Sequence, residues 1–280
     1  MANVLVLRLG GPLQSWGGSQ RLPLNRRTEL FPTKSAVIGM LAAALGRGRS
    51  DDVQDLTNLR FGVRADRPGK VLSDFHTVSS LFDEQGIFAP DRGRLPLAGG
   101  GYRSSETSTQ LTYRYYLADA CFVAGLEGEL SDLEGFERAL RKPEFPLYLG
   151  RRACPPDRPV CGVPVTDEAG GHSRVKALWE GSLEEVFQSV PWQAGVESRR
   201  TGVGDRRTSR VEAVIESLDG HREVMDEPVS FDPIRRAYRQ RRVKHEYFEL
   251  DDPTSADLDE DAPEDFLPPE HDPLALLRED

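Results

Sequence analysis

Short apolar segments alternate with polar ones over the first half of the chain, and their period changes from segment to segment. Val4–Leu9 is an apolar run that ends at a Gly-Gly-Pro turn, which predicts a buried strand. Thr33–Leu45 is apolar almost all round, which predicts a buried helix. Pro32 before its first turn and Gly46 after its end strengthen that prediction.

Strand patterns follow this helix. Arg60–Ala65 and Val71–Val78 predict two strands joined by a turn at 66–69, where the sequence is Asp-Arg-Pro-Gly. Gln110–Ala124 predicts a long strand with an apolar and aromatic face of period two. We expect that face in the core; it comprises Leu111, Tyr113, Tyr115 and Leu117.

A second helix is predicted at Ser131–Arg141, because Ser131 and Glu134 have the spacing of a capping box and Pro143 follows. Strands and two helices in this order favour an antiparallel sheet. We therefore predict an α+β fold with a ferredoxin-like (RRM-like) domain, in preference to a doubly wound parallel sheet.

Residues 79–109 form a long insertion in this pattern, with few core residues and a triple glycine at 99–101. A loop of this length inside a compact domain is usually functional or disordered. Its arginines, Arg92, Arg94 and Arg103, favour a protruding arm that contacts RNA or a neighbouring protein.

The pattern changes after Pro164 and becomes rich in strands. Strands are predicted at Val175–Trp179, Ser209–Leu218, Glu223–Val224 and Arg235–Leu250, with a hairpin turn at 218–221. Ser182–Val190 predicts a short helix with a Ser182/Glu185 capping box. We therefore divide the chain into a domain of residues 1–164, a smaller β-rich domain of residues 165–250 and an acidic, disordered tail of residues 251–280.

Charge is distributed unevenly along the chain. The net charge is −10, but residues 249–280 hold 13 of the 46 acidic residues and one of the 36 basic ones. Residues 1–248 therefore carry 35 basic and 33 acidic side chains, and many arginines occur in adjacent pairs such as 26–27, 151–152, 235–236 and 241–242. Clustered arginines on a nearly neutral body favour a nucleic-acid-binding protein, although a single pair is usually an ordinary solvated surface.

Three cysteines, and a first strand that follows Met1 directly, lead us to expect reduced thiols and a cytoplasmic location. The longest apolar run is too short to cross a bilayer, so no membrane partner is expected. The spacing of Cys154 and Cys161 is not that of a zinc knuckle, and the five histidines are scattered. We therefore expect neither a metal nor a cofactor.

The predicted helix at 33–45 begins with Thr33, Lys34 and Ser35. The N–H groups of a helix N-terminus beside a lysine suit a phosphate, although a plain N-cap explains the same residues equally well. The glycines of a P-loop are absent, which argues against ATP hydrolysis. Nearby in sequence, Gln14, Ser15 and Trp16 form a polar-aromatic cluster, and we expect Trp16 to stack on a base.

Arg151 and Arg152 follow a predicted glycine turn and precede a stiff Pro-Pro pair. An arginine fork binds phosphate bidentately and can stack on a base, so we expect RNA contact here. Asp74 and His76 share one face of a predicted strand. A histidine with a carboxylate partner could act as a general base, but a packed structural histidine is the commoner case.

Several of these segments, taken in order, resemble the CRISPR-associated RAMP superfamily, and within it the CasD subunits of the type I-E Cascade surveillance complex. The resemblance runs from about Val4 to Pro156 and more loosely to Leu250, and the acidic tail departs from it. It is carried by residues 11–17, 27–28, 32–35, 37–46, 59–64, 74–77 and 148–152.

The resemblance implies a ferredoxin-like RAMP domain with a β-hairpin thumb, here residues 79–109, and a smaller β domain. It further implies a non-catalytic subunit that caps the 5′ handle of the CRISPR RNA (crRNA) in antiviral defence. The backbone RAMP subunit and the large subunit of Cascade would be its protein partners. The RNA-binding residues that we expect are Gln14, Ser15, Trp16, Arg27, Thr33, Lys34, Ser35, His76, Arg103, Arg151 and Arg152.

Two alternatives stay open. The type I-C relatives of this family cut precursor crRNA without a metal, so His76 with Lys34 or Tyr102 is the alternative nuclease centre. A purely structural assembly subunit is the third hypothesis.

Overall fold

A computed structural model provides the structure of the chain. Two of the sequence predictions fall outside the part that it describes: the inserted arm, with Tyr102 and Arg103, and the acidic tail beyond residue 251. The described residues are 2–17, 25–78, 101, 110–166, 173–194 and 208–251.

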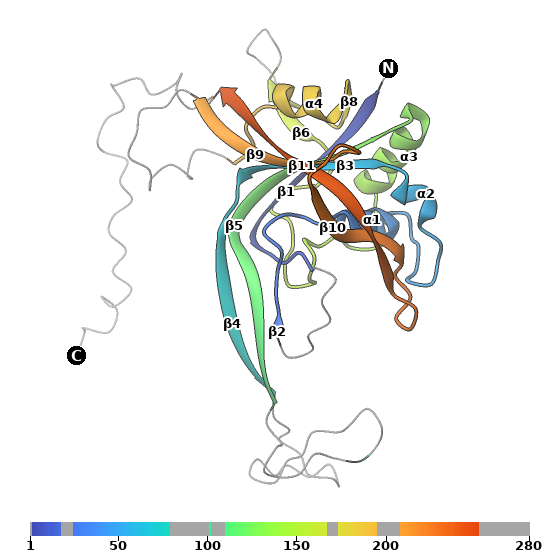
Figure 1. The fold of residues 1–280 in the computed structure, drawn as a ribbon, viewed down its shortest axis with the longest axis vertical. Coiled ribbons are helices and arrows are strands. Elements are labelled where there is room, and N and C mark those ends of the chain that lie inside the picture. The colour runs from blue at the N-terminus through green and yellow to red at the C-terminus, as the bar shows by residue number, and fades with distance from the viewer. Residues whose placement is uncertain are drawn as a thin grey trace, which may run out of the picture.

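The fold is a mixed α/β arrangement built on one large, mostly antiparallel sheet (Figure 1). Its strands are β1 (Asn3–Gln14), β2 (Asn25–Arg26), β3 (Arg60–Arg67), β4 (Lys70–Val78), β5 (Gln110–Gly128), β8 (Leu178–Glu180), β9 (Thr208–Glu216), β10 (Arg222–Ser230) and β11 (Ala237–Asp251). A separate two-stranded ribbon consists of β6 (Val163–Thr166) and β7 (Ser173–Lys176). The helices are α1 (Lys34–Ala44), α2 (Gln54–Thr57), α3 (Leu130–Arg141) and α4 (Leu183–Ser189).

The 19-residue strand β5 is the spine of the sheet. Strand β1 pairs along one edge of β5, and β3 and then β4 pair along the other. The predicted turn at 66–69 therefore does not fold β4 back onto β3. Instead, Gly69, with φ of +73°, links two successive strands that both pair with β5.

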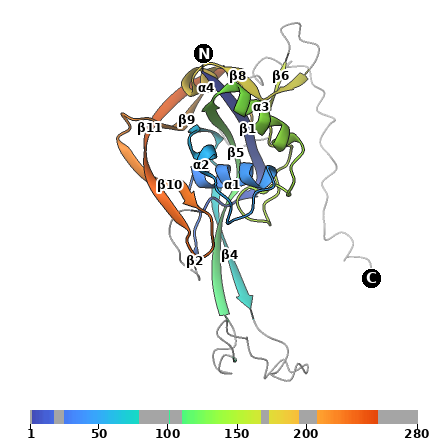
Figure 2. The ribbon, with the colours of Figure 1, turned by 90° about the vertical axis from the view of Figure 1, so that its right-hand side faces the viewer.

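Both faces of the sheet are covered along β1, so this strand reads as an apolar run without alternation. On one face Leu5, Leu7 and Leu9 of β1 pack with α1, α2 and α3. On the other face Val4 and Val6 pack with α4. Figure 2 shows the first three helices together on one side of the sheet.

Two of the three predicted helices have a side-chain N-cap. Thr33 caps α1, and its hydroxyl accepts a hydrogen bond from the N–H of Ala36 at 3.3 Å. The capping box of Ser182 and Glu185 at α4 is confirmed. The box predicted for α3 is wrong, because this helix begins at Leu130 and Glu129 occupies the N-cap without a side-chain bond.

Strand β4 and the first part of β5 project from the body as a stem (Figures 1 and 2). Phe75 lies opposite Tyr113, with ring centroids 5.2 Å apart. Leu111 is 50 % exposed and Tyr113 43 % exposed, so the prediction that this face of β5 is core holds only at its base, where Leu117 is buried. The stem leads directly into the predicted arm.

The strands of the predicted C-terminal domain join the same sheet. The order is β10-β11-β9-β3-β5-β1-β8, so β9 pairs with β3 of the first half. The turn at 218–221 does not close a hairpin, because β11 lies between β9 and β10. The hairpin partners are instead β10 and β11, joined by residues 231–236. Among the described residues, none of the helices is both long enough and apolar enough to span a bilayer.

Candidate nucleic-acid interface

A large groove lies over α1, where four segments distant in sequence meet. Its volume is about 1240 Å³. The segments are residues 26–29, the exposed side of α1 with the loop after it, residues 146–151, and the β10–β11 connection. The groove is lined by six arginines and one acidic residue, namely Arg26, Arg27, Arg47, Arg49, Arg151, Arg236 and Glu29.

The floor of the groove is formed by α1. Its residues Ala36, Gly39 and Ala43 line the groove, and small side chains leave room for a ligand above the helix. At Gly39 the ring of Phe231, from the β10–β11 connection, would lie 3.6 Å from an added Cβ. Tyr148 and Tyr238 add aromatic rings to the walls. The groove thus combines positive charge with aromatic surface, as single-stranded nucleic-acid sites do.

The predicted glycine turn places Arg151 in the groove wall. Gly150 has φ of +91°, and a Cβ on it would overlap the carbonyl oxygen of Ser15, so only glycine fits there. The backbone N–H of Ser15 donates to Leu149 O at 3.0 Å and fixes the turn against β1. Arg151 lies over the ring of Tyr116, with 4.7 Å from Cζ to the centroid.

One end of the Arg151 guanidinium is satisfied and the other is not. Its Nη2 donates to Arg26 O at 2.8 Å, whereas its Nη1 is buried without a hydrogen-bond partner in the described structure. A buried donor without a partner is rare in native proteins, and this one lies in the groove wall, where an acceptor could reach it. Arg152, next to it, is exposed.

Gln14 and Trp16 are placed differently from the prediction, since both side chains are fully buried. Gln14 Nε2 donates to Leu9 O at 3.0 Å and to Ala120 O at 2.7 Å, and its Oε1 accepts from Trp16 Nε1 at 3.0 Å. Trp16 packs in the core with its ring covered. The expected stacking of Trp16 on a base is therefore wrong for this conformation, although Ser15 does line the groove.

Lys34 is also turned inward, contrary to the prediction. Its side chain is 1 % exposed, and Nζ lies 3.0 Å from Glu216 Oε2 and 3.6 Å from Glu227 Oε2. The backbone N–H of Lys34 donates to Asp226 Oδ2 at 2.8 Å. An internal carboxylate thus occupies the helix end that the sequence offered to a phosphate.

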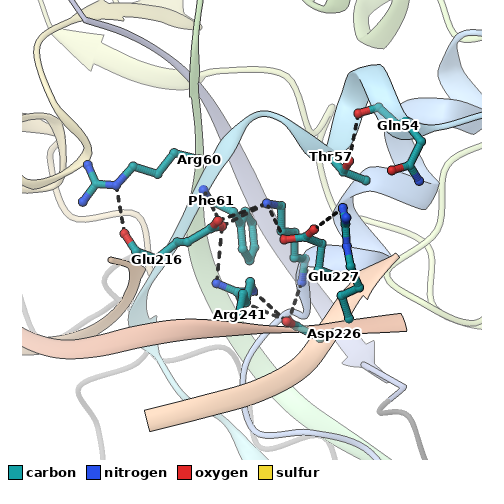
Figure 3. A network of polar contacts seen from close by, with 10 residues as sticks. Gln54, Thr57, Arg60, Phe61, Glu216, Asp226, Glu227 and Arg241 are labelled. Carbon is teal, nitrogen blue, oxygen red and sulfur yellow. Dashed lines mark hydrogen bonds and ion pairs between the residues drawn. The ribbon is translucent and has the colours of Figure 1, made fainter. Parts of the chain in front are cut away.

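Figure 3 shows the ionic network around this helix end. Asp226 is bound by Arg241 through Nε at 2.6 Å and Nη2 at 2.9 Å. Glu216 is shared between Lys34 and Arg241, whose guanidinium lies 5.2 Å from the centroid of the Phe61 ring. The network joins the start of α1 to β9, β10 and β11, and so fixes the floor of the groove to the sheet.

The two neighbours of Lys34 have lesser roles. Thr33 is 6 % exposed and serves as the N-cap of α1. Ser35 lies within 3.3 Å of the Thr33 hydroxyl and lines the groove.

His76 forms the expected pair with Asp74 on the stem, through Nε2 and Oδ2. The pair is partly exposed. No contact joins it to Lys34 within the described ranges, and Tyr102 and Arg103 lie outside them. The structure therefore shows the pairing of His76 with Asp74 but does not bring His76 together with Lys34. Among the described residues, no cluster of histidine, cysteine and carboxylate side chains could hold a metal ion.

Of the eleven residues predicted from the sequence, Ser15, Arg27, Ser35 and Arg151 line the groove. Sequence reasoning missed the other four arginines of the lining and the two tyrosines of the walls: Arg26, Arg47, Arg49, Arg236, Tyr148 and Tyr238. For Arg26 and Arg236 a signal was available in the adjacent pairs at 26–27 and 235–236, since one member of the second pair and both of the first are in the lining.

The comparisons with known proteins agree with this architecture. The family model described as "CRISPR-associated protein (Cas_Cas5)" matches residues 4–244. The chain is 34 % identical over 174 residues to "CRISPR system Cascade subunit CasD" of Escherichia coli (strain K12), which covers 57 % of this chain and 70 % of that protein.

Two solved structures are similar along most of the chain. One, titled "CRISPR RNA-guided surveillance complex", has a TM-score of 0.68 and 32 % identity, and covers 89 % of this chain and 91 % of its own. The other, titled "Crystal structure of Cas protein", has a TM-score of 0.58 and 34 % identity. The match covers 87 % of this chain and 94 % of the other. The chain therefore belongs to the CRISPR-associated (Cas_Cas5) protein family and is a homologue of the Cascade subunit CasD.

Proposed function

We propose that the protein is a non-catalytic crRNA-binding subunit of a Cascade surveillance complex, which caps the 5′ handle of the crRNA. The observation that carries this proposal is the groove with six arginines against one glutamate. A surface with this charge attracts a phosphate backbone, and the tyrosines in its walls offer stacking surfaces. The unsatisfied Nη1 of Arg151 is the donor best placed for a phosphate oxygen.

The same proposal includes a ferredoxin-like domain. The strand order β8-β1-β5-β3, with α1 between β1 and β3 and α3 between β5 and β8, supports it. We keep the thumb at residues 79–109, with Arg103, because its sequence connects the two paired strands of the stem, β4 and β5. The thumb and stem would contact the backbone RAMP subunit and the large subunit. Free, buried cysteines at positions 121, 154 and 161 support a cytoplasmic location.

The test is the salt dependence of binding to a 5′-handle RNA oligonucleotide. Each lost phosphate contact lowers the slope of log Kd against log salt by about 0.7 for a single strand. We expect a slope reduced by about 2 when Arg26, Arg27 and Arg151 are each replaced by alanine. The matched control replaces Arg222 and Arg242, which are exposed on β10 and β11 outside the groove, and should leave the slope unchanged. An unchanged slope in the triple variant would remove the groove from RNA binding.

The pair of Asp74 and His76 keeps metal-independent endoribonuclease activity as the second candidate. That reaction would yield a 2′,3′-cyclic phosphate from a repeat-hairpin RNA in EDTA. We expect no cleavage by the pure protein. Cleavage that disappears on His76→Ala would overturn the non-catalytic assignment.

A further inference from the structure

We propose that the acidic C-terminal segment, residues 252–280, binds the arginine groove of its own chain and competes there with nucleic acid. The contact itself is inferred from charge and reach, whereas its role as a competitor of RNA rests on the function proposed above. In a free subunit the segment would screen the groove from unrelated RNA, and a specific ligand would displace it.

Charge complementarity is the first argument. Residues 252–280 carry eleven acidic side chains and one arginine, so their net charge equals the −10 of the whole chain. The remainder, residues 1–251, is balanced at 35 basic and 35 acidic residues. The molecule thus places an excess of negative charge in one segment and an excess of positive charge in one groove.

Three of the groove arginines also differ from the other arginines of the fold, whereas a fourth, Arg47, is paired with Asp55 at 2.6 Å. Arg64 and Arg241 have carboxylate partners in the core, at 2.7 Å from Asp66 and 2.6 Å from Asp226. By contrast, Arg26, Arg27 and Arg49 form no ion pair with any described residue. These three side chains are exposed, and the Nη1 of Arg151 is buried without an acceptor among the described residues. A carboxylate supplies the acceptor that arginine binds bidentately, so aspartates and glutamates suit this groove as well as phosphates do.

The segment is long enough to reach the groove. Strand β11 begins next to Arg236 and Tyr238 on the groove wall and ends at Asp251, at most about 46 Å away at 3.3 Å per residue (Figure 1). The 29 residues that follow can span up to about 95 Å. The segment can therefore return along the sheet and lie in the groove with residues to spare.

Competition within one chain is effective even when the contact is weak. A tethered segment of this kind has an effective concentration of about 1 mM. If the free peptide binds with a Kd of about 50 µM, the groove is occupied about 95 % of the time, and the apparent affinity for RNA falls roughly 20-fold.

The experiment compares the full chain with a full-length variant in which all eleven acidic residues of 252–280 are changed to Asn or Gln. A fluorescent oligo-U RNA is the probe, at low salt. We expect the neutral-tail variant to bind this RNA 10- to 20-fold more tightly, and the difference to disappear at about 0.5 M salt because the competing contact is electrostatic. Equal affinities of the two proteins at low salt would overturn the proposal.

A second measurement needs no RNA. A labelled peptide of residues 252–280 is titrated with the neutral-tail protein, and again after Arg26, Arg27 and Arg151 are replaced by alanine in it. We expect binding in the first case and at least a 10-fold loss in the second, with Arg222→Ala and Arg242→Ala as the unaffected control. Binding that survives the triple replacement would place the segment elsewhere and overturn the proposal. A groove that binds the peptide but not the handle RNA would instead contradict the proposed function alone.

Discussion

The guanidinium of Arg151 is fixed from two sides, by the ring of Tyr116 below it and by the carbonyl of Arg26 beside it. Its backbone is fixed by the turn at Gly150, which approaches Ser15 too closely for any side chain. Because the side chain is preorganised, a phosphate can bind it without the cost of ordering a free arginine. The turn is therefore as important for the groove as the charge that it carries.

Replacing Gly150 with alanine should test this dependence. A Cβ there meets Ser15 O at a φ of +91°, so we expect a loss of roughly 2 to 3 kcal/mol in unfolding free energy and at least a 10-fold loss in RNA affinity. Gly135→Ala is the matched control, because this glycine lies within α3 with open space around its Cα. It should gain up to about 1 kcal/mol and leave RNA binding unchanged. Urea denaturation and fluorescence anisotropy measure the two effects.

Because Lys34 is buried in an ionic network, we expect it to contribute to stability and not to RNA binding. Lys34→Met keeps the length of the side chain but removes the buried cation between Glu216 and Glu227. Among the described residues, these carboxylates then retain only Arg241 at 3.7 Å and Arg239 at 2.7 Å as ion-pair partners. We expect the unfolding free energy to fall by about 3 kcal/mol, near the lower end of the range for a broken buried pair because Glu216 is 23 % exposed.

The salt dependence of RNA binding should be the same in Lys34→Met as in the parent protein. The exposed Arg152→Ala serves as the stability control, with an expected change within about 0.5 kcal/mol. A reduced salt slope with unchanged stability would return Lys34 to the RNA interface.

Which side chains face the groove could be predicted only in part. The glycine turn before Arg151 is a local signal, and a local signal was enough to place it. The burial of Gln14 is instead explained by its bonds to Leu9 and to Ala120, which lies on a strand more than a hundred residues away, and Trp16 donates in turn to Gln14. Lys34 likewise meets carboxylates from β9 and β10. Neither pairing leaves a trace in the sequence near the residue concerned.

At the scale of secondary-structure elements, the two predicted capping boxes show how well a short sequence motif predicts where a helix begins. Ser182 and Glu185 form both bonds of the box at α4, while Ser131 lies one residue inside α3 and caps nothing. The spacing is the same in both cases. The difference is that the N-cap of α3 is Glu129, two residues before Ser131, so the helix begins at Leu130.

Serine-to-alanine changes at these two positions form a matched pair. Ser182→Ala removes the acceptor for the N–H of Glu185, so we expect a loss of about 1 kcal/mol in unfolding free energy. Ser131→Ala removes no cap, and its expected change is within about 0.5 kcal/mol. Equal losses in urea denaturation would contradict the helix start at Leu130.

Most strands and all of the longer helices could be predicted from periodicity, but their pairing could not. The strands β3 and β4 have the pattern of a hairpin because Pro68 and Gly69 separate them. In the structure both pair with the long strand β5, whose length is sufficient for two successive partners. Similarly, β11 inserts between β9 and β10. This strand order depends on long-range packing, which a short turn sequence does not determine.

At the scale of the whole molecule, the groove exists only because distant segments meet. The ionic network of Lys34, Asp226 and Arg241 holds α1 against β10 and β11, and thereby brings the β10–β11 connection to the groove (Figure 3). On the opposite face of the sheet, α4 is tied to two strands by a second set of ion pairs. Disruption of either set should therefore affect the fold as a unit.

The second set predicts how stability depends on pH. Burial of Glu184 on α4 raises its pKa, but hydrogen bonds from Arg60 on β3 and Lys244 on β11 outweigh burial and lower the pKa from 4.5 to about 2. A carboxyl with a lowered pKa in the folded state contributes stability above its unfolded pKa, and this stability is lost as the pH falls from 4.5 toward 2. At neutral pH we expect Glu184→Gln to lose about 2 to 3 kcal/mol of unfolding free energy. The loss should shrink below pH 4.5 and vanish near pH 2, in urea denaturation at each pH. The control is Glu180→Gln, at an exposed glutamate on β8, which should change the unfolding free energy by less than about 0.5 kcal/mol at every pH. A loss of unfolding free energy in Glu184→Gln that does not change with pH would show that the packing of Glu184, and not its charge, joins α4 to the sheet.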